Sequence, residues 1–520
     1  MDALIEALRD PACYPHPAPE VMVMETHISW VLLAGGYAYK IKKPLNLGFV
    51  DFSTLQRRRH FCTEELRLNR RLAQQLYLAV VPVTGSRAHP RMGGSAPAIE
   101  YAVQMRRFPQ QARLDHRLAD GNLSGEDIDA VSDHVAAFHR RSAVDDDPAG
   151  YGTPDAVHRP VRDNFDQIRP LLEHADPRRR LENLTGASEA AFQALRDTLA
   201  ARKRAGAVRE CHGDLHLGNL VALPEGITAF DCIEFNPDLR WIDVISDVAF
   251  LAMDLVHRGH QDLAFRFLNG YLQATGDYPG AAVLPYYLAY RAMVRAKVAA
   301  ISRSQHPADA PAGTALEAEY QAYVDLGAEL ATPRRGAVII THGLSGSGKT
   351  WLTDTLVQAL PALRVRSDVE RKRLHGLAAD AGSGSAPGEG IYTPQATERT
   401  YGRLADAVRT IAAAGYTAIA DAAFLDRTRR GHFAALARDL GVPFMILDCR
   451  ADESVLRERV RARQETGSDA SEADLAVLER QLAADQSLDD AEHRASVSVD
   501  TTNPQAPAQA LNALRARVAG

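Results

Sequence analysis

The 520-residue sequence has few cysteines, no long apolar run and no strong excess of one charge. Its five cysteines include no C-x-x-C pair, which argues against a disulfide framework and against a cysteine zinc site. No apolar run reaches the roughly 18 residues of a membrane-spanning helix. The opening segment MDALIEALRD lacks the basic and apolar regions of a signal peptide. We therefore expect a cytoplasmic protein with no membrane partner.

The composition is that of an ordinary globular protein, with 46% hydrophobic and 24% charged residues. The net charge of -6 argues against binding nucleic acid through overall charge, although it leaves room for a local basic groove. At roughly 150 residues per domain, a chain of this length predicts two to four domains.

The hydrophobic patterns change near residue 334. Before it, the sequence predicts strands at Val21–Leu33, Tyr37–Lys42 and Ile99–Phe108, a helix at Leu55–Leu76, and mostly helices after Asp127. After it, short apolar runs typical of buried parallel strands recur at Ala337–Thr341, Leu363–Arg366, Tyr416–Ala420, Pro443–Leu447 and Ala495–Val499. Helical patterns separate these runs, so residues 335–520 are predicted to form an α/β domain with a parallel five-stranded sheet.

A phosphate-binding motif, GLSGSGKT, follows the first of these strands and precedes a helix. Its backbone N–H groups and the helix N-terminus can hold phosphates, Lys349 can neutralise the β and γ oxygens, and the Thr350 hydroxyl can hold Mg²⁺. The predicted nucleotide-binding residues are Gly343, Ser345, Gly346, Ser347, Gly348, Lys349 and Thr350.

Two carboxylates follow neighbouring strands of the same predicted sheet. Asp368 can accept the proton of an attacking hydroxyl, and Asp421 can support the Mg²⁺ shell. Arg371 can contact an anionic acceptor, while Arg457 and Arg461 lie on a segment that could close over the nucleotide. The alternatives are a helix cap for Asp368, a turn residue for Asp421 and solvated helix faces for the arginines.

Residues 336–520 resemble the small P-loop kinases, which include gluconate, shikimate, zeta-toxin and polynucleotide 5′-kinases. The segment Arg366-Ser367-Asp368-Val369-Glu370-Arg371-Lys372 is most similar to the last two groups. In those groups the aspartate is the general base and the following arginine contacts the acceptor, which implies these roles for Asp368 and Arg371.

A second catalytic pattern, HGDLHLGN, begins at His212. Asp214 and Asn219 have the spacing of the aspartate and asparagine in H-R-D-x-x-x-x-N, and Asp231 follows a predicted hairpin. We expect Asp214 to deprotonate a hydroxyl, and Asn219 and Asp231 to supply oxygen ligands to Mg²⁺. A zinc site at His212 and His216 would need a helix that the two glycines disfavour.

The same chemistry needs a lysine on the N-terminal sheet. Lys40 in Tyr37-Ala38-Tyr39-Lys40 fits this role, with Lys42 as the alternative. Glu65, or Glu64, on the next helix is expected to pair with it.

Four further acids near this pattern also carry predictions. Asp243 and Asp247 are expected to bond the backbone of the catalytic loop. Glu234, Asp238 and Asp243 would together suit a cationic acceptor.

Residues 20–330 resemble the aminoglycoside phosphotransferase and choline kinase group of the protein-kinase-like fold. The resemblance rests on Lys40, Glu65, Asp214, Asn219 and Asp231. It implies an α+β two-lobed domain over residues 1–334, with an N-lobe at about 20–108 and a helical lobe at about 109–334. The glycine-rich loop is reduced to Ala34-Gly35-Gly36, and Cys232 stands where protein kinases have phenylalanine.

Together these patterns predict a tandem kinase that uses ATP, or GTP, and Mg²⁺ at two sites. The expected partners are small polar phosphate acceptors, such as a sugar, aminosugar or sugar phosphate. Two alternatives stay open: one half regulates the other by binding nucleotide, or the C-terminal half is a polynucleotide 5′-hydroxyl kinase. The sequence does not determine the oligomeric state.

Overall fold

The computed structural model describes residues 2–46, 50–172, 174–307, 310–385, 388–466 and 471–518. It divides into two compact units, the first made of Met1–Pro160 and Leu199–Leu251, the second of Val161–Thr198 and Ala252–Gly520. The second unit thus contains helices from both sides of residue 334. The predicted domains, 1–334 and 335–520, stay a prediction, because the units group residues by spatial contact and not by chemistry.

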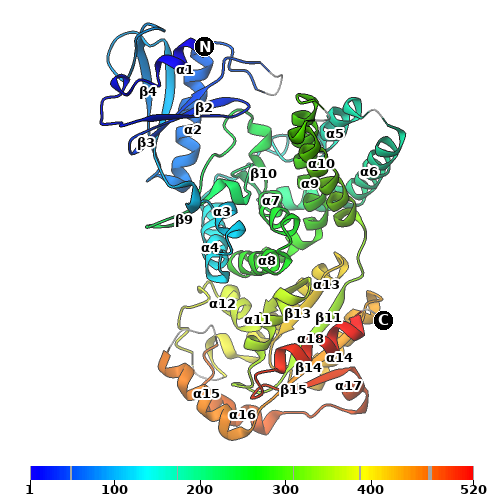
Figure 1. Ribbon diagram of the computed structural model, residues 1–520. Helices are drawn as coiled ribbons and strands as arrows, with labels where there is room; N and C mark the ends of the chain where they lie inside the picture. The colour runs from blue at the N-terminus through cyan, green and yellow to red at the C-terminus, as the bar shows by residue number, and fades with distance from the viewer. Residues whose placement is uncertain are drawn as a thin grey trace. The chain divides into compact units, whose positions relative to one another are not determined.

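The first unit contains a six-stranded antiparallel sheet in the order β1-β2-β3-β6-β4-β5 (Figure 1). Its strands are β1 (Val21–Glu25), β2 (Ser29–Ala34), β3 (Tyr37–Lys42), β4 (Tyr77–Gly85), β5 (Pro90–Met92) and β6 (Glu100–Arg106). Helix α2 (Leu55–Ala73) packs against β4 and β6. The predicted run Val21–Leu33 is two strands joined by a turn, and β4 and β5 were not predicted.

Short elements and helices complete the first unit. Its small two-stranded sheets pair β7 (Val208–Glu210) with β10 (Trp241–Asp243) and β8 (Leu220–Leu223) with β9 (Gly226–Ala229). Its helices are α1 (Asp2–Ala7), α3 (Leu114–Ala119) and α4 (Gly125–Arg141), with the 3-10 helices η1 (Pro11–Cys13), η2 (Gln110–Ala112), η4 (Leu217–Asn219) and η5 (Pro237–Leu239). Helices α5 (Pro154–Ile168), α6 (Ala175–Arg204) and α7 (Val244–His257) have residues in both units.

The second unit begins with helices that precede the phosphate-binding motif. These are α8 (Gln261–Thr275), α9 (Leu284–Ser304) and α10 (Pro311–Ala331), with the 3-10 helices η3 (Arg169–Leu171) and η6 (Tyr278–Ala282). Helices α9 and α10 form the most extensive helix pair of the unit.

The rest of the second unit is a parallel five-stranded sheet in the order β12-β13-β11-β14-β15. Its strands are β11 (Ala337–His342), β12 (Ala362–Arg366), β13 (Thr417–Asp421), β14 (Phe444–Arg450) and β15 (Ser496–Asp500). Its helices are α11 (Lys349–Ala359), α12 (Ser367–Leu374), α13 (Pro394–Ala413), α14 (Arg427–Asp439), α15 (Glu453–Thr466), α16 (Leu475–Ala484), α17 (Asp490–Ala495) and α18 (Ala506–Val518), with η7 (Gly390–Tyr392). All five predicted strands are present within about one to three residues at their ends.

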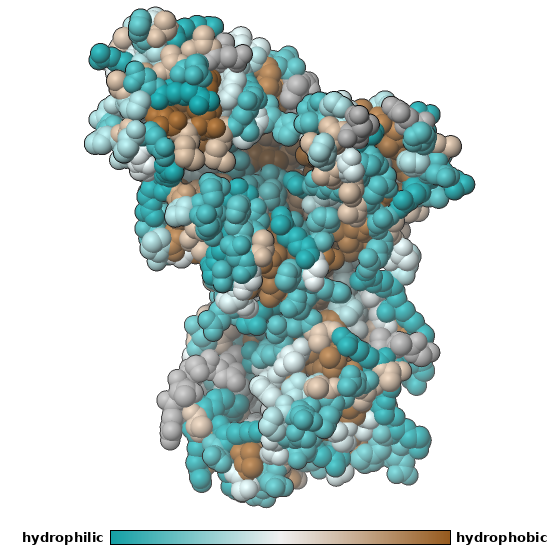
Figure 2. Space-filling view, viewed as in Figure 1, coloured by the Kyte–Doolittle hydropathy of each residue, from teal (hydrophilic) through white to brown (hydrophobic). Residues whose placement is uncertain are grey.

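The surface drawn in Figure 2 is mostly hydrophilic, and hydrophobic residues form small separate areas. Within the described parts of the chain, the exposed large hydrophobic side chains are Met22, Met24, Val144, Val298 and Trp351. Across the described residues, no helix combines the length and apolar character needed to cross a membrane.

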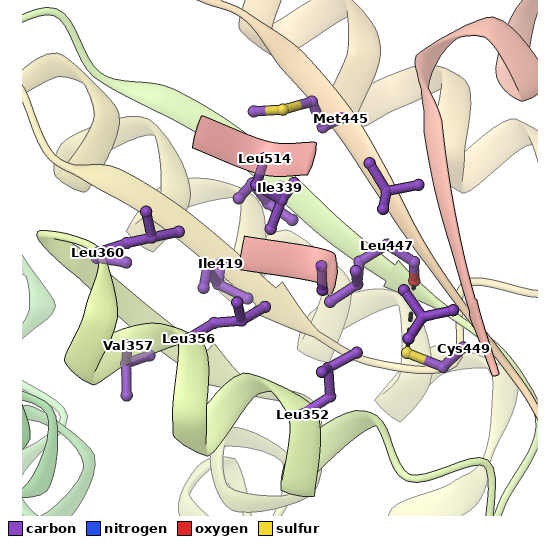
Figure 3. Packing of buried hydrophobic residues seen from close by; sticks show 14 of the residues in the cluster. Ile339, Leu352, Leu356, Val357, Leu360, Ile419, Met445, Leu447, Cys449 and Leu514 are labelled. Atoms are coloured by element: carbon purple, nitrogen blue, oxygen red, sulfur yellow. Dashed lines mark hydrogen bonds between the residues drawn. The ribbon is translucent and has the colours of Figure 1, made fainter. Parts of the chain in front are cut away.

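The core beneath the phosphate-binding motif lies between the sheet and two helices. Leu352 and Leu356 on α11 point toward the sheet, where they meet Ile419 of β13 (Figure 3). Leu514 on α18 enters the same cluster, while α13 and α14 pack on strands from the other face. Helices on both faces explain why β11 is buried along its whole length and reads as an apolar run.

Leu356→Ala is expected to lower the free energy of unfolding by about 2–5 kcal/mol, because it leaves a cavity in this fully buried cluster. Thr355→Ala, one residue away on the exposed side of α11, should change it by less than about 0.5 kcal/mol. Denaturant unfolding of both variants measures the difference, and equal effects would contradict the packing.

Candidate functional site

Lys40 on β3 lies between two carboxylates. Its ammonium nitrogen is 2.9 Å from Glu65 on α2 and 2.5 Å from Asp231, just after β9. Burial alone lowers the pKa of Lys40, yet Asp231 and Glu65 offset this effect and raise the pKa well above its ordinary value. The expected pair of Lys40 with Glu65 is therefore present, whereas the alternative acid, Glu64, pairs with Arg67.

Lys42, the alternative lysine, is fully buried on the same face of β3. It lies 2.6 Å from Glu65 and pairs closely with Glu234. Burial opposes ionisation of Glu65, but Lys40 and Lys42 lower its pKa to about 2. Burial raises the pKa of Glu234, and the neighbouring Glu65 adds to this.

These two lysines and three carboxylates form one network that carries one surplus negative charge when all are ionised. That surplus suits a divalent cation at Asp231, whose side chain is 42% exposed.

The catalytic loop is held by its own side chains. The Asn219 amide nitrogen donates to the Asp214 carboxylate and to the Asp214 carbonyl, both at 3.0 Å. His216 lies 3.5 Å from the same carboxylate and accepts from the Gly218 N–H through its other ring nitrogen. Asp214 stays 37% exposed, so a hydroxyl can reach it. The amide nitrogen of Asn219 is used here, so its oxygen is the atom that can serve as a metal ligand.

Asp231 has a left-handed backbone, with φ of 67°, which is uncommon for a residue other than glycine. Two side chains hold the backbone there: the Tyr77 hydroxyl accepts from the Asp231 N–H at 3.1 Å, and the Asn69 side-chain oxygen accepts from the Cys232 N–H at 2.9 Å. Neither Tyr77 nor Asn69 was predicted, and no local signal marks them. Such local strain often accompanies function, and here it turns the Asp231 carboxylate toward Lys40.

The two aspartates after the loop have different roles. Asp247 accepts the N–H groups of His212 and Gly213, both at 2.9 Å, which confirms the prediction that it bonds the loop backbone. For Asp243 that prediction is wrong, because its carboxylate is buried against Arg202 at 2.6 and 2.8 Å.

The predicted acidic surface for a cationic acceptor is also not present. Glu234 and Asp243 are buried and paired with Lys42 and Arg202. Asp238 is exposed, 3.9 Å from Arg159. Glu234 and Asp243 are thus already paired with cations of the chain, which spacing in the sequence could not reveal.

The phosphate-binding loop connects β11 to α11 and depends on glycine at three positions. Gly343, Gly346 and Gly348 have φ of 142°, 83° and 78°, a region in which other residues are strained. A Cβ on Gly343 would also meet the Cys449 carbonyl at 2.5 Å. Lys349 folds over the loop and donates to the carbonyls of Gly343 and Leu344 at 2.9 and 2.7 Å. Burial lowers the pKa of Lys349, although Asp421 opposes this.

The oxygen atoms expected to support Mg²⁺ lie together at the edge of the sheet. The Thr350 hydroxyl donates to Asp421 at 3.0 Å, and Thr353 donates to the same carboxylate oxygen at 3.3 Å. Asp421 ends β13 beside the loop and is only 5% exposed. A threonine hydroxyl supported by a carboxylate is a hard oxygen donor set, so these residues fit a magnesium ion.

Asp368 stands on the first turn of α12 and is partly exposed. Its charge acts to raise the pKa of both Lys349 and Tyr392, so the carboxylate lies near the phosphate loop and near η7. Arg371 is 8% exposed, donates to Ile391 O and Thr397 Oγ1 at 3.0 and 3.1 Å, and lies over the Tyr392 ring. Among the described residues, its buried Nε has no hydrogen-bond partner.

The arginines expected to form a lid are placed differently from the prediction. Arg457 pairs with Glu453 and Glu479, and Arg461 is exposed with no hydrogen bond or ion pair to the described residues. Instead, Arg459 donates to Gly346 O at 3.2 Å and to Thr501 at 3.0 Å. Residue spacing does not separate Arg459 from Arg457, because the two lie about equally far around α15 from the buried pair Leu456 and Val460.

Gln481 on α16 was also missed by the sequence analysis. Its side-chain oxygen accepts from the Ser345 N–H of the phosphate loop at 2.7 Å. No local pattern distinguishes this glutamine from others on the surface.

Lys42→Met is expected to lower the free energy of unfolding by about 3–5 kcal/mol, because it leaves two carboxylates buried beside one lysine. The double variant Lys42→Met/Glu234→Gln should recover part of this loss. Lys43→Met, which removes a lysine paired with the exposed Glu25, should cost less than about 1 kcal/mol. Denaturant unfolding decides between these values, and equal losses for the two lysines would contradict the network.

Arg459→Ala is expected to weaken MgADP binding at the phosphate loop by about 10-fold, because Arg459 holds the loop through Gly346. Arg461→Ala removes the same charge from the same helix and should leave binding within about 2-fold. Calorimetry measures MgADP binding by both variants. The part of the binding signal that is lost in Lys349→Ala is assigned to the phosphate-loop site. Equal weakening would show that only the charge of α15 matters.

Comparison with known proteins identifies both halves of the chain. Residues 50–284 match the phosphotransferase enzyme family and residues 338–488 match an AAA domain family. The chain is therefore an enzyme of the phosphotransferase kind, with an N-terminal aminoglycoside phosphotransferase-like domain and a C-terminal P-loop kinase-like domain.

Solved structures similar to parts of the chain include kinases of both kinds. An amicoumacin kinase in complex with AMP-PNP, Ca²⁺ and Ami is 15% identical and covers 62% of this chain and 93% of its own, with a TM-score of 0.41. A gluconokinase from Sinorhizobium meliloti 1021 is 22% identical and covers 36% of this chain and 95% of its own, with a TM-score of 0.25.

Relatives exist over nearly the whole length of the chain. The uncharacterized proteins Rv2004c of Mycobacterium tuberculosis (strain ATCC 25618 / H37Rv) and Mb2027c of Mycobacterium bovis are each 32% identical over 504 residues. The match covers 95% of this chain and 96% of each relative. The chain belongs to the family of these mycobacterial proteins, and it joins a phosphotransferase domain to a P-loop kinase-like domain.

Proposed function

We propose that the chain is a tandem kinase in which each half transfers the γ-phosphoryl group of ATP, with Mg²⁺, to a hydroxyl of a small polar metabolite. One observation carries this proposal. Each half holds a reachable carboxylate, Asp214 or Asp368, in addition to the lysine and the oxygen ligands that hold a nucleotide. Nucleotide binding alone does not require such a base, whereas transfer to a hydroxyl does.

At the first site, Lys40 holds the nucleotide phosphates while Glu65 fixes the direction of its ammonium group. Asn219 and Asp231 would hold Mg²⁺ through oxygen ligands, and the ion would neutralise phosphate charge when bound. Asp214 orients the acceptor hydroxyl and takes its proton as the new oxygen–phosphorus bond forms and the bond from the γ-phosphorus to the departing ADP breaks.

At the second site, the N–H groups of the phosphate loop and Lys349 hold the phosphates, and Thr350 with Asp421 holds Mg²⁺. Asp368 takes the proton of the acceptor hydroxyl. Lys372 and Arg373 are already bonded within the protein, to Ala379 O and to Glu370. Arg371, with its unpartnered Nε, is therefore the cation that we assign to an anionic acceptor such as a sugar phosphate.

Asp214→Asn and Asp368→Asn are each expected to lower one transfer by about 100-fold to 10,000-fold and to leave the other unchanged, because an amide cannot take the proton. Labelled ATP with Mg²⁺ and a panel of sugars, aminosugars and sugar phosphates measures the products. Asp238→Asn and Asp406→Asn remove exposed carboxylates and serve as matched controls.

Three other results would contradict parts of the proposal. Products that are unchanged in both Asp variants would refute the tandem kinase. Acceptor-free ATP hydrolysis at the phosphate loop, together with a change of first-site activity in Lys349→Ala, would identify a regulatory half. Labelling of an RNA or DNA oligomer with a 5′-hydroxyl would identify a nucleic-acid acceptor, with binding that falls steeply with salt.

A further inference from the structure

The edge strand β12 of the parallel sheet is paired on its outer side by a side chain. Asn269 on α8 donates from Nδ2 to Ala362 O at 2.9 Å and accepts at Oδ1 from the Arg364 N–H at 2.7 Å. The amide thus bonds two backbone groups that a neighbouring strand would otherwise bond. Asn269 is 8% exposed, so both bonds are shielded from water. Helix α8 therefore fixes the strand that leads directly into α12.

The far end of α12 is bonded to the same helix. Arg373 donates to the carbonyls of Gln273 and Ala274 in the last turn of α8, where a cation is favoured by the helix dipole. Gly276, with φ of 73°, ends α8, and a Cβ there would come within 2.6 Å of Arg373 Nε. The Arg373 guanidinium therefore packs directly on Gly276, and any other residue at position 276 would displace that guanidinium.

A fully buried carboxylate joins these contacts. Glu370 on α12 lies 3.0 Å from Arg373 and 3.3 Å from Arg403 of α13. Arg403 in turn donates to Gly276 O at 2.8 Å. Arg373 and Arg403, the two guanidiniums that neutralise Glu370, are thus also hydrogen-bonded to the end of α8. The ion pairs and the hydrogen bonds hold the same two side chains in place.

Helix α12 has only eight residues, too few to be stable without tertiary contacts. Asp368 precedes Arg373 by five positions, which places it about 7.5 Å along the axis and about 140° around it. Arg373 therefore holds the helix from one side while Asp368 faces the phosphate loop from another. The contacts of Arg373 lie away from the phosphate loop, so Arg373 does not act on the nucleotide directly.

We propose that α8 and Gly276 form the rigid base that presents Asp368 at the phosphate-loop site, with Asn269 and Arg373 as positioning residues for phosphoryl transfer. The inference rests on the proposed function of that site. It also means that the site depends on residues 261–276, which lie outside the segment 338–488 that matches the AAA domain family.

The test uses the full chain with Arg373→Ala and Asn269→Ala, and with Gly276→Ala as a milder variant that displaces Arg373. Hydrogen exchange of the amides of residues 367–374 should become about 10-fold faster or more. At the phosphate-loop site, kcat should fall by about 10-fold while the KM for ATP stays within about 2-fold. In an Asp368→Asn background, Arg373→Ala should lower kcat no further, because it acts through Asp368.

Arg409→Ala, on the exposed side of α13, and Gln273→Ala, which keeps the accepting carbonyl, should behave as the unaltered chain. Unchanged exchange in all three variants would overturn the proposal, as would faster exchange with unchanged kcat. If Asp368→Asn leaves every product unchanged, the proposed function fails and the positioning role fails with it. Failure of the proposed function alone is recognisable, because the positioning variants would still show faster hydrogen exchange at residues 367–374 than the control variants.

Discussion

Both sites depend on buried charged groups whose partners offset the loss of water. A charge removed from water costs several kcal/mol unless an opposite charge and hydrogen bonds replace the water. At the first site, two lysines of β3 share three carboxylates from α2 and from the segment after β9. This pairing fixes α2, the sheet and the segment around Asp231 in one arrangement, because movement of any partner would expose or isolate a charge.

The second unit meets the same constraint in a different way. Asp421 is buried against two threonine hydroxyls, and Glu370 is buried between two guanidiniums. The first arrangement serves the phosphate loop, and the second holds α12. Hydroxyl hydrogen bonds therefore support the group that would hold the metal, and charge pairing supports the helix that carries Asp368.

Much of the architecture could be predicted, because it follows from local patterns. The five strands of the parallel sheet are buried on both faces and so read as short apolar runs, and the phosphate loop requires glycines at positive φ. The ion pair of Lys40 with Glu65 was also expected. The arginine that contacts the phosphate loop, Arg459, was not predicted, because Arg457 and Arg459 lie about equally far around α15 from the buried Leu456 and Val460.

The sequence by itself determined the five strands of the parallel sheet, where two phosphate-handling motifs lie, and which carboxylates are candidates for the base. These properties depend on residues close together in the chain. Only the tertiary structure decided how the charges are shared: that Lys42 pairs with Glu234, 192 positions away, that Asp243 is used by Arg202, and that Asn269 completes β12. The physical reason is that a buried charge or backbone group needs whichever partner folding brings to it, and sequence spacing does not record that distance.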